Sequence, residues 1–208
     1  MEESLSYMKL LAIIGSQRIE GNSYLLAEEV LKSIGEVDYE IIQLAEKKIG
    51  FCNFCGKCEF GECVLEDDLN SIVEKMTVAD GIIFSFPKYF TVPSKLLCFL
   101  ERLDMVQHCK KYRGFKKTGV EPDPDFTPPF KGKPLCLFVV SATGRAEEPL
   151  RLVAYQLAGM EMRLIMHDSW PFLGVPVKGE GRGEVLADQK GMEDCVRLIR
   201  RLVDSINR

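Results

Sequence analysis

The sequence lacks an apolar run of 18 residues, about the length that a helix needs to cross a bilayer, so we expect no membrane span. It also lacks an excess of basic residues: the formal net charge is −4, which gives no electrostatic reason to expect a nucleic-acid partner. No secretory signal opens the chain, because the apolar stretch Lys9–Ile14 is short and ends at Gly15. We therefore expect a cytoplasmic, reducing location, where cysteines stay as free thiols.

Histidine is scarce as well, which narrows the choice of acid–base groups. His108 and His167 fall at the predicted ends of a helix and a strand, and we assign neither of them a proton-transfer role. No other residue is assigned as catalytic. The length of 208 residues and the hydrophobic content of 46% are typical of one globular domain, residues 1–208.

Strand and helix patterns alternate along the chain. The predicted strands are Met8–Ile14, Asp38–Leu44, Gly81–Phe86, Leu135–Val140 and Met162–Met166. The first predicted helix has Asn22 or Ser23 as its N-cap and ends at Gly35. The other predicted helices are Glu66–Thr77, Ser94–His108, Glu147–Leu157 and Ala187–Ile206. This alternation predicts an α/β fold with a parallel sheet covered on both faces. The flavodoxin-like, doubly wound, five-stranded sheet of order 2-1-3-4-5 is the most economical arrangement.

Residues 110–134 depart from this alternation. The segment contains five prolines and shows no clear periodicity. We expect a long insertion between the third helix and the fourth strand, either functional or used for subunit contact.

Half of the eight cysteines lie close together, in a predicted loop after the second strand, residues 50–65. Cys52, Cys55, Cys58 and Cys63 have the spacing C-x2-C-x2-C-x4-C, and a curled loop of this kind can point several sulfurs at one centre. The same C-x2-C-x2-C opening occurs in ferredoxins, which favours a [4Fe–4S] cluster. Zinc usually joins two separated pairs of ligands, but zinc, thiol–disulfide chemistry and a vestigial site all stay open. The remaining cysteines, which we expect to be small buried hydrophobic residues, are Cys98, Cys109, Cys136 and Cys195.

The loop after the first strand, Gly15–Ser23, is rich in hydrogen-bond donors and leads into a helix N-terminus, where anions bind well. It matches neither a P-loop nor G-x-G-x-x-G, and a terminal monophosphate fits it better than a pyrophosphate. After the first strand of a flavodoxin-like sheet, it predicts an FMN phosphate site. The candidate residues are Ser16, Gln17, Arg18, Gly21, Asn22 and Ser23.

Two further loops leave the carboxyl ends of strands, where ligands bind in open α/β sheets. The loop after the third strand could flank a flat ring with Pro87, Lys88, Tyr89 and Phe90. The loop after the fourth strand could complete the pocket with Ser141, Thr143 and Gly144.

Three ordered motifs together resemble the iron-sulfur flavoproteins of the NADPH-dependent FMN reductase superfamily. They are Gly15-Ser16-x-Arg18-x-x-Gly21-Asn22-Ser23, the Cys52–Cys63 motif followed by Glu66-Asp67-Asp68, and Ala79-Asp80-Gly81-Ile82-Ile83-Phe84-x-x-Pro87-x-Tyr89-Phe90. The resemblance implies non-covalent FMN and a [4Fe–4S] cluster on the four cysteines. It also implies a homo-dimer or homo-tetramer in which one subunit's cluster lies near a partner's flavin. The sequence departs from the family at Gln17, where proline is common, and at Leu97 and Glu101, where lysine and aspartate are common.

These features together predict an oxidoreductase that transfers electrons between the cluster and FMN. Ferredoxin or NAD(P)H is the expected donor, and O2 or H2O2 an expected acceptor. One alternative is a cluster-free NAD(P)H-dependent FMN or quinone reductase. Another is a binding protein whose cysteine loop senses redox state or metal.

Overall fold

The computed structural model describes residues 8–35, 37–58, 62–112, 121–168 and 173–207. Its centre is a parallel sheet of β1 (Lys9–Ile14), β2 (Asp38–Gln43), β3 (Gly81–Pro87), β4 (Pro134–Ser141), β5 (Arg163–Leu164) and β6 (Val175–Lys178). The strand order is β2-β1-β3-β4-β5, with β6 also paired to β4. The predicted flavodoxin-like fold and order 2-1-3-4-5 are confirmed.

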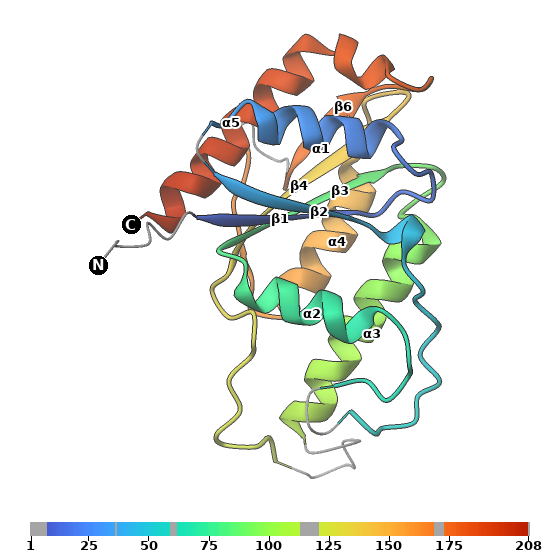
Figure 1. Cartoon of the computed structure of the whole chain (residues 1–208), viewed down its shortest axis with the longest axis vertical. Helices are drawn as coiled ribbons and strands as arrows, with labels where there is room; N and C mark the ends of the chain where they lie inside the picture. The colour runs from blue at the N-terminus through green and yellow to red at the C-terminus, as the bar shows by residue number, and fades with distance from the viewer. Residues whose placement is uncertain (1–7, 36, 59–61, 113–120, 169–172, 208) are drawn as a thin grey trace, which may run out of the picture.

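Helices cover both faces of the sheet (Figure 1). On one face lie α1 (Asn22–Lys32) and α5 (Gln189–Ile206), and on the other α2 (Leu69–Val78), α3 (Ser94–Lys111) and α4 (Glu147–Gly159). Strand β1 serves both layers, since Leu11 and Ile13 pack against α2–α4 while the alternate residues pack against α1 and α5. A strand buried on both faces must be apolar throughout, and this is why its sequence is a continuous hydrophobic run.

The sheet edge beyond β4 differs from the prediction. Instead of one strand over Met162–Met166, two short strands share this edge: β5 pairs with the start of β4, and β6 with its end. Strand β6 was missed because Pro176 interrupts a run of only four residues, and proline argues against a strand unless it lies at an edge or bulge. Gly174 precedes β6 where a Cβ would overlap the backbone of Leu137, so the chain can approach β4 closely only without a side chain.

The N-cap of α1 and the start of α2 also differ from the prediction. Gly21 is the N-cap of α1, and no side chain caps this end, so neither Asn22 nor Ser23 acts as a cap. Helix α2 starts at Leu69 rather than Glu66, because the preceding acidic residues bind a different segment. Asp68 accepts the N–H of Lys48 at 2.6 Å, and Asp67 accepts the N–H of Gly50 at 2.9 Å. Two short 3-10 helices, η1 (Leu44–Glu46) and η2 (Glu184–Ala187), complete the described elements.

The predicted insertion, residues 110–134, is in part integral to the domain. Its first two residues belong to α3 and its last to β4. Residues 113–120 lie outside the described part, and residues 121–133 form neither helix nor strand. Phe130 is fully buried in the core, and the N–H of Asp123 donates to the carbonyl of Lys111 at 2.7 Å. The second half of the segment therefore packs back onto its own domain.

Among the described residues, no helix is both long enough and apolar enough to cross a membrane.

Candidate functional site

A cavity of about 440 Å³ opens at the carboxyl ends of β1, β3, β4 and β6. The loops after the first three of these strands are the ones that the sequence singled out. The predicted residues that line the cavity are Ser16, Arg18, Gly21, Asn22, Ser23, Pro87, Lys88, Tyr89 and Ser141. The structure thus brings together, at one sheet edge, residues that are far apart in the chain.

The β1–α1 loop forms a tight turn at one end of this cavity. The hydroxyl of Ser16, which is almost fully buried, accepts the N–H of Arg18 at 3.0 Å. A Cβ at Gly21 would lie 3.2 Å from the Cβ of Arg18, so the turn has little room for a side chain there. The next N–H groups, those of Asn22 and Ser23, begin α1 and precede the N–H of Tyr24, which donates to the Gly21 carbonyl at 2.9 Å; such first N–H groups lack an acceptor within the helix.

Ser23 has an unsatisfied hydroxyl in this cavity. Its side chain is 1% exposed, and within the described part of the chain its Oγ has no hydrogen-bond partner. A buried hydroxyl without a partner costs about 1–3 kcal/mol, and native proteins rarely leave one so. A bound group with acceptor oxygens would remove that cost. The donors at this end of the cavity therefore fit a phosphate.

Asn22 lines the cavity, but its side chain binds protein. Its Nδ2 donates to the carbonyl of Gly181 at 2.8 Å, and its Oδ1 accepts the N–H of Gly183 at 2.7 Å. The loop that it fixes follows β6 and adds Gly179, Glu180 and Arg182 to the lining. Sequence reasoning missed this loop because it missed β6. The glycine-rich run Gly179-Glu-Gly-Arg-Gly183 was the signal that could have found it.

Four predicted residues do not line the cavity. The side chain of Gln17 donates to Ser94 Oγ at 2.8 Å, toward the start of α3. Phe90 is 94% exposed. Thr143 and Gly144 both bond to Ser141 instead. The Thr143 and Ser141 hydroxyl oxygens lie 3.4 Å apart, and the N–H of Gly144 donates to the Ser141 carbonyl at 3.3 Å.

The cysteine segment lies beside α3, on the same side of the sheet as α2 (Figure 1). Cys58 is buried, whereas Cys52, Cys55 and Cys63 are half-buried, and all four are free thiols. Burial foremost, and then the neighbouring Cys63 and Cys109, raise the pKa of Cys58 to about 12. The sulfur-rich donor set suits iron, although in the described residues no three potential ligands are arranged closely enough to hold a metal.

Two cysteines of α3 face this segment. Both are buried, as predicted, and Cys109 belongs to the core cluster on the α2–α4 face of the sheet. The thiol of Cys98 donates to the carbonyl of Gly50 at 3.2 Å, and Cys109 is hydrogen-bonded to Cys58. The sequence around Cys98 and Cys109 did not indicate these contacts, because the cysteine segment is distant in sequence and reaches α3 only when the chain is folded. Cys136 and Cys195, by contrast, lie in the core on the α1–α5 face.

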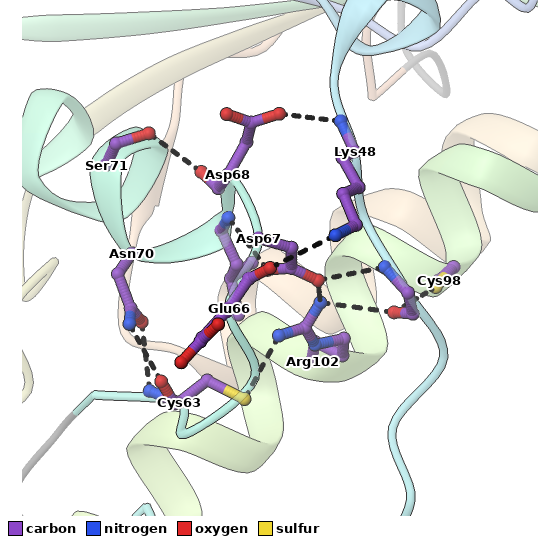
Figure 2. Close-up of polar contacts among 11 residues, drawn as sticks. Lys48, Cys63, Glu66, Asp67, Asp68, Asn70, Ser71, Cys98 and Arg102 are labelled. Atoms are coloured by element: carbon purple, nitrogen blue, oxygen red, sulfur yellow. Dashed lines mark hydrogen bonds and ion pairs between the residues drawn. The ribbon is translucent and has the colours of Figure 1, made fainter.

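Arg102 of α3 contacts two points of the cysteine segment and the neighbouring Asp67 (Figure 2). Its guanidinium forms an ion pair with Asp67, donates to the carbonyl of Gly50 at 3.1 Å and donates to Cys63 Sγ at 3.0 Å. Burial alone would raise the pKa of Asp67, but the hydrogen bonds from Arg102 and from the Gly50 and Leu69 N–H groups lower it below its ordinary value. Sequence reasoning assigned Arg102 no role.

The comparisons with known proteins agree with this architecture. The NADPH-dependent FMN reductase family matches residues 8–170. The chain belongs to this family, which confirms at that level the resemblance seen in the motifs.

Individual relatives add detail. An iron-sulfur flavoprotein of Methanocaldococcus jannaschii is 42% identical over 99 residues, which are 46% of this chain and 51% of that protein. The match thus spans about half the length of that relative. A putative NAD(P)H-dependent FMN-containing oxidoreductase of Bacillus subtilis is 25% identical over 201 residues, 93% of this chain and 98% of that protein. The solved structure of a Trp repressor binding protein from Bacillus subtilis has the same fold, with a TM-score of 0.60 at 23% identity over 91% of this chain and 99% of that one.

Proposed function

We propose that this chain is an iron-sulfur flavoprotein, an oxidoreductase that transfers electrons between a [4Fe–4S] cluster and FMN. The FMN site is the cavity at the carboxyl ends of β1, β3, β4 and β6. The cluster ligands are Cys52, Cys55, Cys58 and Cys63. Membership of the FMN reductase family supports the flavin, and the name of the archaeal relative supports the cluster.

One observation carries the flavin assignment: the buried hydroxyl of Ser23 in the cavity wall, for which the described residues provide no hydrogen-bond partner. It stands at the N-terminal end of α1, where the helix dipole favours negative charge. Arg18 lines the same end and adds a positive charge. A phosphate group satisfies all three features at once.

When bound, FMN supplies one- and two-electron chemistry, while the protein supplies orientation and electrostatics. The phosphate is held by Ser23, Arg18 and the first turn of α1. Pro87, Lys88 and Tyr89 form the wall nearest the flavin ring. Lys88 is fixed there because its N–H donates to the carbonyl of Val140 at 2.7 Å, which ties the β3 loop to β4.

The electron donor, the electron acceptor and the subunit assembly are proposed on the basis of the same iron-sulfur flavoprotein assignment. Ferredoxin or NAD(P)H is the proposed donor, and O2 or H2O2 a proposed acceptor. The proposed working unit is a homo-dimer or homo-tetramer in which the cysteine segment faces a partner's flavin. Sedimentation at micromolar concentration measures this assembly, and a monomer would contradict it.

The experiment that tests the flavin site compares FMN with riboflavin, which lacks the phosphate. Ser23→Ala should weaken FMN binding about tenfold to a hundredfold, because a hydrogen bond to a charged group contributes about 1.5–3 kcal/mol. Riboflavin should bind the variant and the wild type alike. Ser71→Ala, which changes an exposed serine of α2, is the control and should bind FMN normally. Equal losses of FMN and riboflavin in Ser23→Ala would show that Ser23 does not contact the phosphate.

The cluster is tested by iron and acid-labile sulfide content after anaerobic purification. We expect about four irons and four sulfides per chain, as a [4Fe–4S] centre requires. A flavin-containing protein without iron would instead support the second candidate, a cluster-free NAD(P)H-dependent FMN or quinone reductase. Two observations favour that candidate: among the described residues no three potential ligands are close enough together to hold a metal, and a relative matched over nearly the whole chain is named an FMN-containing oxidoreductase.

A further inference from the structure

Arg102 occupies a position where a charge is costly. Its side chain is 1% exposed, and it is the largest fully buried side chain among the described residues. On α3 it lies among core residues such as Phe99 and Leu103. Hydrophobic residues of similar volume often replace a buried ion pair without loss of stability, so its presence here points to another need.

The contacts of Arg102 join the start of the cysteine segment, at Gly50, to its end, at Cys63, and to Asp67 just beyond it (Figure 2). One nitrogen, Nη1, bonds both Asp67 and the carbonyl of Gly50, while Nη2 donates to the sulfur of Cys63 at 3.0 Å. The Asp67 carboxylate in turn accepts the N–H of Gly50. This arrangement fixes the guanidinium and aims one N–H at sulfur.

The backbone of Cys63 is held as firmly as its side chain. Asn70 accepts the N–H of Cys63 at 2.9 Å and donates to its carbonyl at 2.8 Å. Cys63 is therefore held in place by α2 through Asn70 and by α3 through Arg102. Cys52 and Cys55 sit earlier in the same segment beside exposed Phe51 and Phe54.

We propose that Arg102 is a positioning residue that raises the reduction potential of the cluster by donating a charge-assisted hydrogen bond to the Cys63 sulfur, and that Asp67 offsets part of this effect. The inference rests on the proposed cluster. Reduction adds one electron, and the negative charge on the ligand sulfurs grows. A cation and an N–H donor at sulfur therefore stabilise the reduced state more than the oxidised state. A carboxylate beside the cation acts in the opposite sense.

Two single variants separate this role from a structural one, because they should move the potential in opposite directions. Arg102→Met removes the cation and the donor while keeping an unbranched side chain, and it should lower the potential. Asp67→Asn leaves the cation without its counter-charge and should raise it. We expect the equilibrium constant for one-electron reduction to change about tenfold in each case, which corresponds to about 59 mV. Lys48→Met is the matched control: Lys48 is an exposed cation of the same region whose Nζ donates to the Glu66 carbonyl at 3.5 Å. The potential of this variant should not move.

The measurement is an anaerobic potentiometric titration followed by electron paramagnetic resonance, in which dithionite supplies the electron and is itself oxidised. Iron and sulfide contents are measured on every variant. The FMN potential, read in the same titration, is the internal reference and should not change. If Arg102→Met does not fold, the upward shift in Asp67→Asn decides the question.

The possible outcomes distinguish a failure of the role proposed for Arg102 from a failure of the proposed cluster. Wild type that contains iron, with Asp67→Asn unshifted or shifted downward, would overturn the role of Arg102 and leave the cluster assignment intact. A shift of the two variants in the same direction would indicate a structural effect and would also overturn it. Wild type without iron would overturn the cluster itself and the inference with it.

Discussion

The side-chain amide of Asn22 bonds the loop after β6 at two points: it donates to the Gly181 carbonyl at 2.8 Å and accepts the N–H of Gly183 at 2.7 Å. These residues are about 160 positions apart in the chain, and the contact joins the start of α1 to the loop after β6, both of which contribute residues to the cavity lining. Asn22 therefore shapes the proposed flavin site by fixing protein backbone.

Replacing Asn22 should consequently weaken flavin binding without removing a phosphate contact. In Asn22→Ala both bonds to the loop are lost, and Gly179, Glu180 and Arg182 lose their fixed position in the cavity wall. We expect FMN and riboflavin to lose affinity by similar factors, about tenfold, because each hydrogen bond contributes about 0.5–1.5 kcal/mol. Fluorescence titration measures both dissociation constants. A loss confined to FMN would mean that Asn22 contacts the phosphate directly.

Replacing Arg18, unlike replacing Asn22, should weaken the binding of FMN and leave that of riboflavin unchanged. The Arg18 side chain is exposed at the cavity mouth, so solvent screens its charge, and we expect Arg18→Ala to weaken FMN binding by about tenfold or less. Riboflavin affinity should stay unchanged, and the difference between wild type and variant should shrink as salt is added. Ile19→Ala, which trims an exposed neighbour in the same lining, is the control. A salt-independent loss would indicate that Arg18 supports the loop rather than the phosphate.

The sequence predicts the scaffold of this site well because the information is local. The runs of β1, β3 and β4 are apolar on both faces, and only buried parallel strands need that pattern. Their order then brings the three following loops to one edge, where the cavity lies. Strand β6 is too short, and too disturbed by Pro176, to give such a signal.

The side-chain directions could not be predicted, because distant partners set them. Gln17 turns away from the cavity toward Ser94, 77 positions later, and Asn22 turns toward the loop after β6. The burial of Arg102 could not be predicted either, since a charged residue in an amphipathic helix is usually expected to face solvent. Its partners Asp67 and Cys63 meet it only after the cysteine segment has folded onto α3.

The ion pair of Asp67 and Arg102 should make stability depend on acid pH. The pKa of Asp67 is lowered in the folded protein, so its contribution is fully present above the unfolded pKa of about 3.9 and is lost as pH falls through the folded value. The difference in unfolding free energy between wild type and Asp67→Asn should therefore be constant from about pH 7 to 5 and shrink below about pH 4. Urea titrations of the metal-free protein at several pH values measure it. A difference that does not change below pH 4 would contradict the ion pair.

Cys58 and Cys109 offer a sharp test of the ligand assignment, because their thiols are hydrogen-bonded to each other and only Cys58 belongs to the motif. Cys58→Ser should lower iron and sulfide content strongly, since a hydroxyl is a poor substitute for a thiolate on iron. Cys109→Ala removes the adjacent buried thiol and should keep both contents near the wild-type level. FMN content should be unchanged in both variants, because neither residue lines the cavity proposed as the flavin site. If Cys109→Ala lost iron as completely as Cys58→Ser, the ligand set would have to include α3, and if neither lost iron the motif would not hold the cluster.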